Sequence, residues 1–320
     1  MTTNKLKVFH GLVNYGTQAG LISRTLREEF NIKAISVVTA DPYKRQIDIE
    51  LLHGGNLTDK IFKHTWNTIR KIYWFFTYNT FHFYYGSTLF PKQFDLPFYK
   101  IFGKKVIMHY LGGDIKLYKT AIDRYNLPEN HRFHKQALVH DENVLKRYRH
   151  ENQYIDIQLV CSPAHAEFTT GAQIIPLALD LNKLPFTRLE PAKILNILHA
   201  PTDPGFKGTA IIEEALDKIK DDGIVFNYKR IENMTHDQLI ENYKSCDIFI
   251  DQISVGWYGT ASLEAMAIGR PTCAFIDPLY FKYIDYSEQI PIVNITKETS
   301  YEVLKELIYN RKKLIELSNE

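Results

Sequence analysis

Short runs of strand-type residues alternate with amphipathic segments in both halves of the chain. Lys5–Gly11 and Ile32–Thr39 are rich in β-branched and apolar residues, and Leu21–Phe30 between them has the spacing of a helix. The same alternation starts again at Lys193–His199 and continues through the second half. A repeated strand–helix–strand order predicts parallel α/β layers. We therefore expect an α/β protein with two facing Rossmann-like domains and an interdomain cleft.

The hydrophobic pattern is interrupted once between these layers. Residues 181–192 carry two prolines and mixed charge, so we predict that they link an N-terminal acceptor-side domain, residues 1–180, to a C-terminal donor domain, residues 193–320. A chain of 320 residues suits two domains of about 150 residues each. We expect the last helix of the second domain at Ser300–Leu317.

One helix of the first half has an unusual distribution of side chains. Apolar residues of Lys60–Thr77 recur on one face of the helical wheel, and Lys63, Arg70 and Lys71 fall mostly elsewhere. Such a basic amphipathic helix can lie on an anionic membrane surface. It can also pack on the first sheet with a solvated basic edge, which is the commoner arrangement in α/β domains.

Charge and cysteine content bear on where the protein acts. Residues 1–180 contain 23 Lys or Arg and 16 Asp or Glu, whereas residues 181–320 contain 16 and 21. The basic half suits an anionic membrane or a phosphorylated substrate, unless the excess belongs only to solvated surfaces. The three cysteines lack metal-ligand or disulfide-framework spacing, and we find no signal peptide and no membrane-spanning run. We expect a cytoplasmic protein, with peripheral contact at the inner membrane face through residues 60–77 if that helix is interfacial.

The most informative loop, Gly256–Pro271, follows a predicted strand at Asp247–Asp251. Gly259 permits a tight turn with close approach of a ligand, and Thr260 is suited to cap a helix. A helix that begins at the carboxyl end of a strand presents free backbone N–H groups, which suit a diphosphate. Glu264, one turn into that helix, can accept hydrogen bonds from a ribose diol, although a surface glutamate stabilised by the helix dipole would look the same.

A second loop, His199–Thr209, also connects a strand to a helix. Its Lys207-Gly208 pair places a cation at the helix N-terminus, where it opposes the dipole and so favours anion binding over a purely stabilising role. The Walker pattern and a true GxGxxG are both absent.

Lys207-Gly208-Thr209, followed by Glu264-Ala-Met-Ala-Ile-Gly-Arg-Pro271, resembles the donor half of the GT-B glycosyltransferases of glycosyltransferase family 4. The resemblance implies a retaining, metal-independent transfer from a nucleoside-diphosphate sugar. We expect this donor to be UDP-linked, and we expect no cofactor. By motif position, Lys207 and Gly208 would hold the diphosphate, Gly259 and Thr260 would offer backbone donors, and Glu264 would bind the ribose. Tyr258 is a further donor-binding candidate.

The first half is similar to this family at two glycine loops. Gly16, Thr17 and Gln18 form our candidate acceptor or phosphate loop, after the first strand. Gly112-Gly113-Asp114 follows a later strand, and Asp114 is our candidate catalytic residue. No residue is assigned to a metal.

The sequence departs from the family pattern at three points. The family usually has two glutamates that flank seven residues, and the first would fall at Gly256. The contact to the donor sugar must therefore come from backbone, from Trp257 or Tyr258, or from elsewhere. An arginine often precedes the lysine, yet Pro201–Phe206 has none, and a histidine is common where Leu111 stands.

We predict a hexosyltransferase-type glycosyltransferase that moves a sugar from a nucleoside-diphosphate sugar to a saccharide or lipid-linked saccharide with retention, in surface polysaccharide or glycan assembly. One alternative is a sugar-nucleotide epimerase of the same fold, which would need extra carboxylates and histidines around the sugar. Another is a non-catalytic sugar-nucleotide-binding partner protein, suggested by the missing glutamate and the early end of the chain. We expect no contact with nucleic acid.

Overall fold

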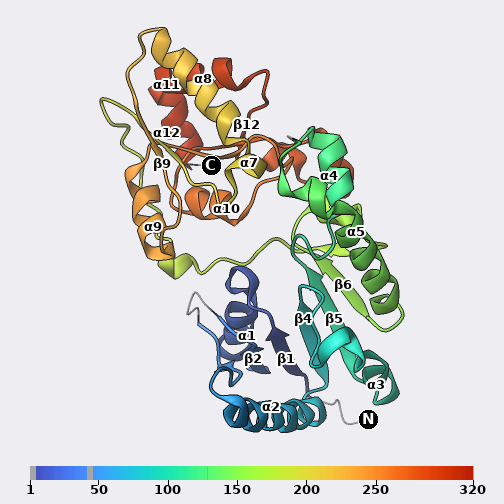
Figure 1. The fold of residues 1–320 in the computed structure, drawn as a ribbon. Coiled ribbons are helices and arrows are strands. Elements are labelled where there is room, and N and C mark those ends of the chain that lie inside the picture. The colour runs from blue at the N-terminus through green and yellow to red at the C-terminus, as the bar shows by residue number, and fades with distance from the viewer. Residues whose placement is uncertain (1–4, 42–45, 128, 320) are drawn as a thin grey trace. The chain divides into compact units, whose positions relative to one another are not determined.

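Two parallel β-sheets organise the computed structural model, which describes residues 5–41, 46–127 and 129–319 (Figure 1). Unit 1 consists of residues 1–120 and 136–178 and contains a seven-stranded sheet; unit 2 consists of residues 121–135 and 179–320 and contains a five-stranded sheet. The strand orders are β3-β2-β1-β4-β5-β6-β7 and β12-β11-β10-β8-β9. The strands are β1 (Lys7–Leu12), β2 (Lys33–Val38), β3 (Ile49–Glu50), β4 (Thr80–Tyr84), β5 (Lys105–Tyr110), β6 (Ile157–Val160), β7 (Gln173–Ile174), β8 (Asn196–His199), β9 (Asn227–Arg230), β10 (Ile248–Gln252), β11 (Thr272–Ala274) and β12 (Val293–Asn294).

Helices cover both faces of each sheet. The α-helices are α1 (Gln18–Glu28), α2 (Leu57–Thr77), α3 (Leu96–Ile101), α4 (Tyr118–Tyr125), α5 (Arg132–Glu151), α6 (Pro163–Ala166), α7 (Pro204–Lys207), α8 (Thr209–Asp221), α9 (His236–Ser245), α10 (Thr260–Ala267), α11 (Ser300–Tyr309) and α12 (Arg311–Asn319). Short 3-10 helices are η1 (Tyr15–Thr17), η2 (Pro91–Gln93), η3 (Leu181–Lys183), η4 (Pro278–Tyr283) and η5 (Ser287–Gln289).

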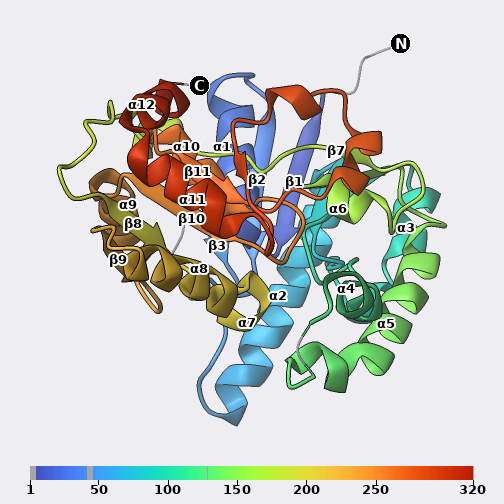
Figure 2. The ribbon, with the colours of Figure 1, turned by 90° about the horizontal axis from the view of Figure 1, so that it is seen from above.

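Parallel strands are buried on both faces, so each sheet is covered by a packed layer on either side. In unit 1, α2, α3 and α5 cover one layer, in which Phe81 and Met108 are fully buried. In unit 2, α8 and α11 lie side by side with α12 over one face (Figure 2), and α9 and α10 cover the other. The predicted fold class, two Rossmann-like α/β sheets, is confirmed.

Several predicted elements differ in detail. The single helix expected at Ser300–Leu317 is divided into α11 and α12, because Asn310 leaves helical geometry and its side chain accepts a hydrogen bond from the Lys313 N–H at 3.0 Å. Thr260 is the first residue of α10 and Gly259 occupies the cap position, so the prediction of a Thr260 cap is wrong by one residue. Every helix in the described part of the chain is too short or too polar to span a bilayer.

Two segments pack with unit 2. Residues 181–192, expected to form a linker, contribute Leu184 and Leu189 to its apolar cores. Residues 121–135, which precede the end of unit 1 in the chain, also belong to unit 2. There the Tyr125 hydroxyl lies 2.7 Å from the Tyr280 hydroxyl, and the rings of Phe133 and Phe206 are 5.3 Å apart.

The face of the unit 1 sheet opposite the phenylalanine-rich layer carries a row of buried histidines. His10 on β1, His82 on β4 and His109 on β5 are almost inaccessible, and successive rings lie 5.0 Å and 5.6 Å apart. His10 Nδ1 lies 2.9 Å from the Tyr84 hydroxyl. Among the described residues, neither ring nitrogen of His109 has a hydrogen-bond partner. Burial lowers the pKa of His10 to about 3 and that of His109 to about 4, because an imidazolium would be poorly solvated there.

These histidines predict acid sensitivity of unit 1. An unfolded histidine takes up a proton below pH 6.5, whereas folded His109 does so only near pH 4, so protons favour the unfolded state within that window. His109 alone then removes up to about 3 kcal/mol of stability between these pH values. We expect His109→Leu to weaken the acid dependence of urea unfolding without loss of stability at pH 7. The control His53→Leu, at an exposed position, keeps the wild-type dependence; an unchanged pH profile for His109→Leu would contradict this origin.

Candidate active site

The two predicted donor loops leave the unit 2 sheet at the point where its strand order reverses. Strand β8 lies between β9 on one side and β10 on the other. In open parallel sheets such a reversal leaves a crevice beyond the carboxyl ends of the strands, and ligands bind there. Residues 200–207 follow β8 and residues 253–259 follow β10, so both loops begin at this edge.

Asp251, on β10, connects these loops. Its carboxylate is buried, and Oδ1 lies 2.6 Å from Lys207 Nζ. Oδ2 accepts hydrogen bonds from the Gly259 N–H at 3.1 Å and from the Ser262 hydroxyl at 2.7 Å. Burial by itself raises the pKa of this carboxyl, but Lys207 and the hydrogen-bond donors outweigh that effect and lower the pKa below its ordinary value. Asp251 is therefore ionised and paired with a cation from the other loop.

The backbone around Lys207 positions its ammonium group. Asp203 caps α7 by accepting a hydrogen bond from the Phe206 N–H at 3.1 Å, and the Lys207 carbonyl accepts one from the Ile253 N–H at 3.0 Å. Gly208 then adopts a left-handed conformation with φ of 73°. An ammonium carries three N–H donors, and Asp251 uses one of them. The Lys207 side chain is 17% exposed, so further donors can reach a ligand.

Helix α10 places its N-terminus beside this lysine. A Cβ built on Gly259 would lie 3.9 Å from Lys207 Nζ. The first N–H groups of a helix have no partner within the helix, and here the Gly259 N–H is satisfied by Asp251. The N–H groups of Thr260, Ala261 and Ser262 come next and point out of the same helix end. A cation and a positive helix end thus converge on one spot.

Glu264 lies one turn further along α10. It is largely buried, and its Oε1 lies 2.8 Å from Nε2 of His236, an exposed residue on α9. The contact with His236 uses one of the two carboxylate oxygens, and the other can accept hydrogen bonds from a diol. His236 gave no signal in the sequence because it belongs to a separate strand–helix unit.

The remaining candidates of unit 2 have mainly structural contacts. The ring of Tyr258 stacks on Trp257 with centroids 5.0 Å apart, and burial raises the pKa of its hydroxyl. His199, at the start of the first loop, is fully buried between the Ile250 carbonyl at 2.8 Å and the Thr209 hydroxyl at 2.9 Å. These contacts fix the base of the loops, and the donor-binding role of Tyr258 stays a prediction.

The candidates of the first half lie in unit 1. Gly16 and Thr17 have positive φ in the turn before α1, and Gln18 bonds to both the N–H and the carbonyl of Ala178 at 2.9 Å. The Asp114 carboxylate is buried and accepts hydrogen bonds from the N–H groups of Leu111 and Gly112, at 3.0 Å and 2.7 Å to Oδ1. Burial raises the pKa of Asp114 to about 6. The acceptor-loop and catalytic roles stay predictions.

Gly256, where a glutamate was expected from the resemblance, has a specific steric environment. Its φ is 79°, and a Cβ added there would overlap the Tyr125 hydroxyl. Tyr125 comes from the 121–135 segment and is tied to Tyr280. Nothing in the sequence indicates this neighbour, because the two residues are more than a hundred positions apart.

No protein-family model and no curated protein matches the sequence. Solved structures do match along nearly its whole length. Sucrose-phosphate synthase from Thermosynechococcus elongatus has a TM-score of 0.64 at 14% identity and covers 98% of this chain and 92% of that one. HepE from Anabaena in complex with UDP-glucose has a TM-score of 0.56 at 12% identity, covering 97% and 92%. A putative UDP-N-acetylglucosamine 2-epimerase from Listeria monocytogenes has a TM-score of 0.51 at 13% identity, covering 98% and 90%.

At this level of identity the likeness defines the fold. Together with the two parallel sheets, it assigns the chain to the GT-B architecture. Among the described residues, no group of three or more His, Cys, Asp or Glu is placed to hold a metal ion.

Breaking the Lys207–Asp251 pair should destabilise unit 2. Lys207→Met leaves a buried, uncompensated carboxylate, so we expect the free energy of unfolding to fall by about 3 kcal/mol. Lys207→Met combined with Asp251→Asn should cost less than the sum of the single variants in a chemical-denaturation cycle. Lys218→Met removes an exposed ion pair with Glu214 and should leave stability nearly unchanged. Strict additivity of the Lys207→Met and Asp251→Asn effects would show that the pair is not coupled.

Gly256→Ala tests the steric role of Tyr125. Both the positive φ and the overlap oppose a side chain, so we expect a loss of about 2 kcal/mol or more. Gly223→Ala is the matched control, since its φ is 82° and the space around it is open. The difference between their melting temperatures isolates the contact with Tyr125, and equal losses would rule that contact out.

Proposed function

We propose that the protein is a glycosyltransferase that takes a sugar from a nucleoside diphosphate, with UDP as the carrier, and transfers it to a saccharide or lipid-linked saccharide. The proposal rests on one observation: Lys207 and the N-terminus of α10 converge at the switch point of the unit 2 sheet, on either side of Asp251. This combination of a point charge and oriented N–H groups matches a diphosphate. The GT-B architecture and the HepE structure with UDP-glucose support it.

The chemistry requires stabilisation of a leaving diphosphate. The bond between the anomeric carbon and the β-phosphate oxygen breaks, and the electron pair stays on that oxygen. The acceptor hydroxyl oxygen forms the new bond to the anomeric carbon, and its proton passes to the departing β-phosphate oxygen. Lys207, oriented by Asp251, and the N–H groups of α10 stabilise the developing negative charge where it appears. We propose that these groups serve without a metal ion, and that transfer proceeds with retention.

Glu264 completes the proposed nucleotide site. Its second carboxylate oxygen would accept hydrogen bonds from the ribose diol, and His236 would hold the carboxylate in position. Asp114 as a catalytic residue and Gly16–Gln18 as an acceptor loop, both in unit 1, are proposed on the resemblance alone. A hexose as the transferred group and polysaccharide assembly as the process belong to the same proposal.

A sugar-nucleotide epimerase is the second candidate. The likeness to the putative 2-epimerase from Listeria favours it at the level of the fold. The two activities differ in their substrates, because transfer requires an acceptor and epimerisation does not. Incubation with UDP-sugars alone, followed by separation of the C2 epimers, distinguishes them: an epimer formed without acceptor would favour the second candidate over the first.

Binding measurements can test the two halves of the nucleotide site separately. Glu264→Gln should weaken UDP binding about tenfold but leave inorganic pyrophosphate unaffected, because only UDP has a ribose. Lys207→Gln should weaken both, and Lys207→Arg should retain more affinity, since it keeps the charge. Calorimetry measures the affinities, and circular dichroism checks that each variant is folded. Glu214→Gln, on the exposed face of α8, is the control; unchanged UDP affinity in both site variants would contradict the site.

A further inference from the structure

Helix α2 presents its apolar side chains to solvent. Seven of them are each 46–66% exposed: Ile61, Phe62, Trp66, Ile69, Ile72, Tyr73 and Phe76. At 3.6 residues per turn they fall within an arc of about 140°. We call this arc the α2 apolar face. Trp74 and Phe75, which are buried, lie on other sides of the helix and pack into the unit 1 core. The helix therefore attaches to the sheet by two aromatic residues and directs most of its hydrophobic surface outward, the reverse of an ordinary surface helix.

Polar groups at the start of this helix and along it are hydrogen-bonded within the helix. Asn56 and Asp59 form a capping box at its start, with the Asn56 side chain accepting from the Asp59 N–H at 2.9 Å. The hydroxyls of Thr65 and Thr77 bond back to the carbonyls of Ile61 and Tyr73, at 3.0 Å and 2.8 Å. A helix with self-satisfied polar groups can enter an apolar environment at low cost.

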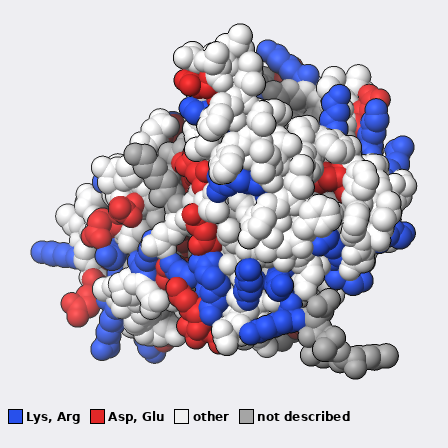
Figure 3. Space-filling model, turned by 90° about the horizontal axis from the view of Figure 1, so that it is seen from below, with Lys and Arg blue, Asp and Glu red and all other residues white. Residues whose placement is uncertain are grey.

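The apolar surface continues from α2 onto α3. Phe102, at the end of α3, stacks edge-on against Phe76 with ring centroids 5.8 Å apart. Phe98 and Ile101 beside it are exposed. Figure 3, seen from the side on which α2 lies in Figure 1, shows a broad, largely uncharged area bordered by many Lys or Arg side chains and by some Asp or Glu side chains. An exposed apolar patch of this kind marks an interaction surface.

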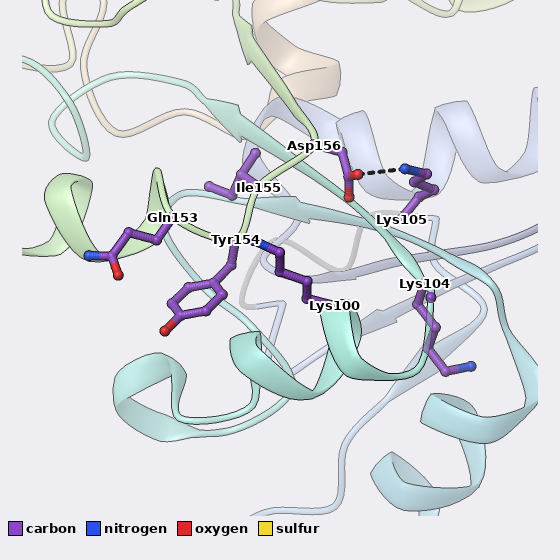
Figure 4. Close-up of a pocket in the computed structure, with 8 residues that line it drawn as sticks. Lys100, Lys104, Lys105, Gln153, Tyr154, Ile155 and Asp156 are labelled. Carbon is purple, nitrogen blue, oxygen red and sulfur yellow. Dashed lines mark hydrogen bonds and ion pairs between the residues drawn. The ribbon is translucent and has the colours of Figure 1, made fainter.

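The charge around the patch has one dominant sign. Residues 57–77 and 91–105 contain eight Lys or Arg and two Asp. Asp59 belongs to the capping box, and Asp95 is buried against Thr88 and Tyr99. At the edge of α3, a hollow of about 310 Å³ is lined by Lys100, Lys104 and Lys105 among others (Figure 4). Lys105 is paired with Asp156 at 2.7 Å, whereas the Lys100 side chain extends toward Tyr154.

We propose that the α2 apolar face and α3 form a docking surface for a bilayer that contains anionic lipids, with α2 parallel to the membrane plane. The apolar side chains enter the boundary between headgroups and acyl chains, and the surrounding lysines and arginines contact lipid phosphates. A second copy of the chain would fit less well, because the segments that form this surface contain an excess of Lys and Arg and two copies would bring like charges together. Trp66 would lie at the lipid interface, where indole rings are favoured.

Vesicle co-sedimentation of the full chain tests this surface without any sugar nucleotide, so its outcome is independent of the proposed activity. The protein should pellet with vesicles of phosphatidylcholine and phosphatidylglycerol, weakly with phosphatidylcholine alone, and less at about 1 M salt, where the Debye length is ~3 Å. Of the three tryptophans, Trp74 and Trp257 are buried, so a blue shift of emission on vesicle addition reports on Trp66.

Substitutions at exposed positions distinguish membrane binding by this surface from nonspecific hydrophobic adsorption. The triple variant Phe62→Ser, Ile69→Ser and Tyr73→Ser should lower vesicle partitioning at least about tenfold, with unchanged circular dichroism. Lys60→Gln with Lys100→Gln should reduce binding to anionic vesicles only. The control Leu138→Ser, Val139→Ser and Val225→Ser removes three exposed apolar side chains elsewhere and should bind as wild type.

Three results would overturn the proposal. The first is an absence of binding to anionic vesicles at low salt. The second is equal binding of the triple variant and the control. The third is a dimer, detected by sedimentation without vesicles, that the triple variant abolishes while vesicle binding is absent. The last outcome would assign the surface to a second copy of the chain.

Discussion

The candidate site depends on the contacts that the buried carboxylate of Asp251 makes. It is the common partner of a lysine from the loop after β8, a backbone N–H at the start of α10 and a hydroxyl within that helix. A buried anion must find such partners, because its desolvation is costly if it stays unpaired. Its requirement for donors therefore draws Lys207 and Gly259 to one place. The pairing orients the Lys207 ammonium but engages only one of its three N–H donors. The other donors suit the binding of a second anion.

The surroundings of Gly256 show how a local sequence difference is accommodated by distant residues. The glycine adopts a backbone conformation that a side chain would strain, and the Tyr125 hydroxyl fills the space beside it. Tyr125 is held by Tyr280, to which Arg124 also donates a hydrogen bond at 2.8 Å. An aromatic cluster thus occupies the space beside the position at which the family resemblance predicts a carboxylate.

Helix α2 illustrates a different limit of pattern analysis. Its amphipathic spacing is plain in the sequence, but periodicity reports only that one face is apolar and not where that face points. In the structure, the helix packs on the sheet through two aromatic residues near its end, Trp74 and Phe75. The α2 apolar face consequently points to solvent. The commoner arrangement, in which the apolar face is buried on the sheet, does not apply here.

Three features follow from the sequence alone: the two α/β layers, the strand–loop–helix context of Lys207 and Glu264, and the amphipathic nature of residues 60–77. These follow from local periodicity, glycine placement and helix-end chemistry, which depend on neighbours within a few positions. Tertiary structure decided the partners: Asp251 for Lys207, His236 for Glu264, Tyr125 for Gly256 and solvent for the α2 apolar face. Each of these pairings joins segments that are far apart in the sequence, and the exposure of the α2 apolar face depends on which side of the helix is covered. Only the folded chain brings those surfaces together, because burial and pairing are properties of the packed whole.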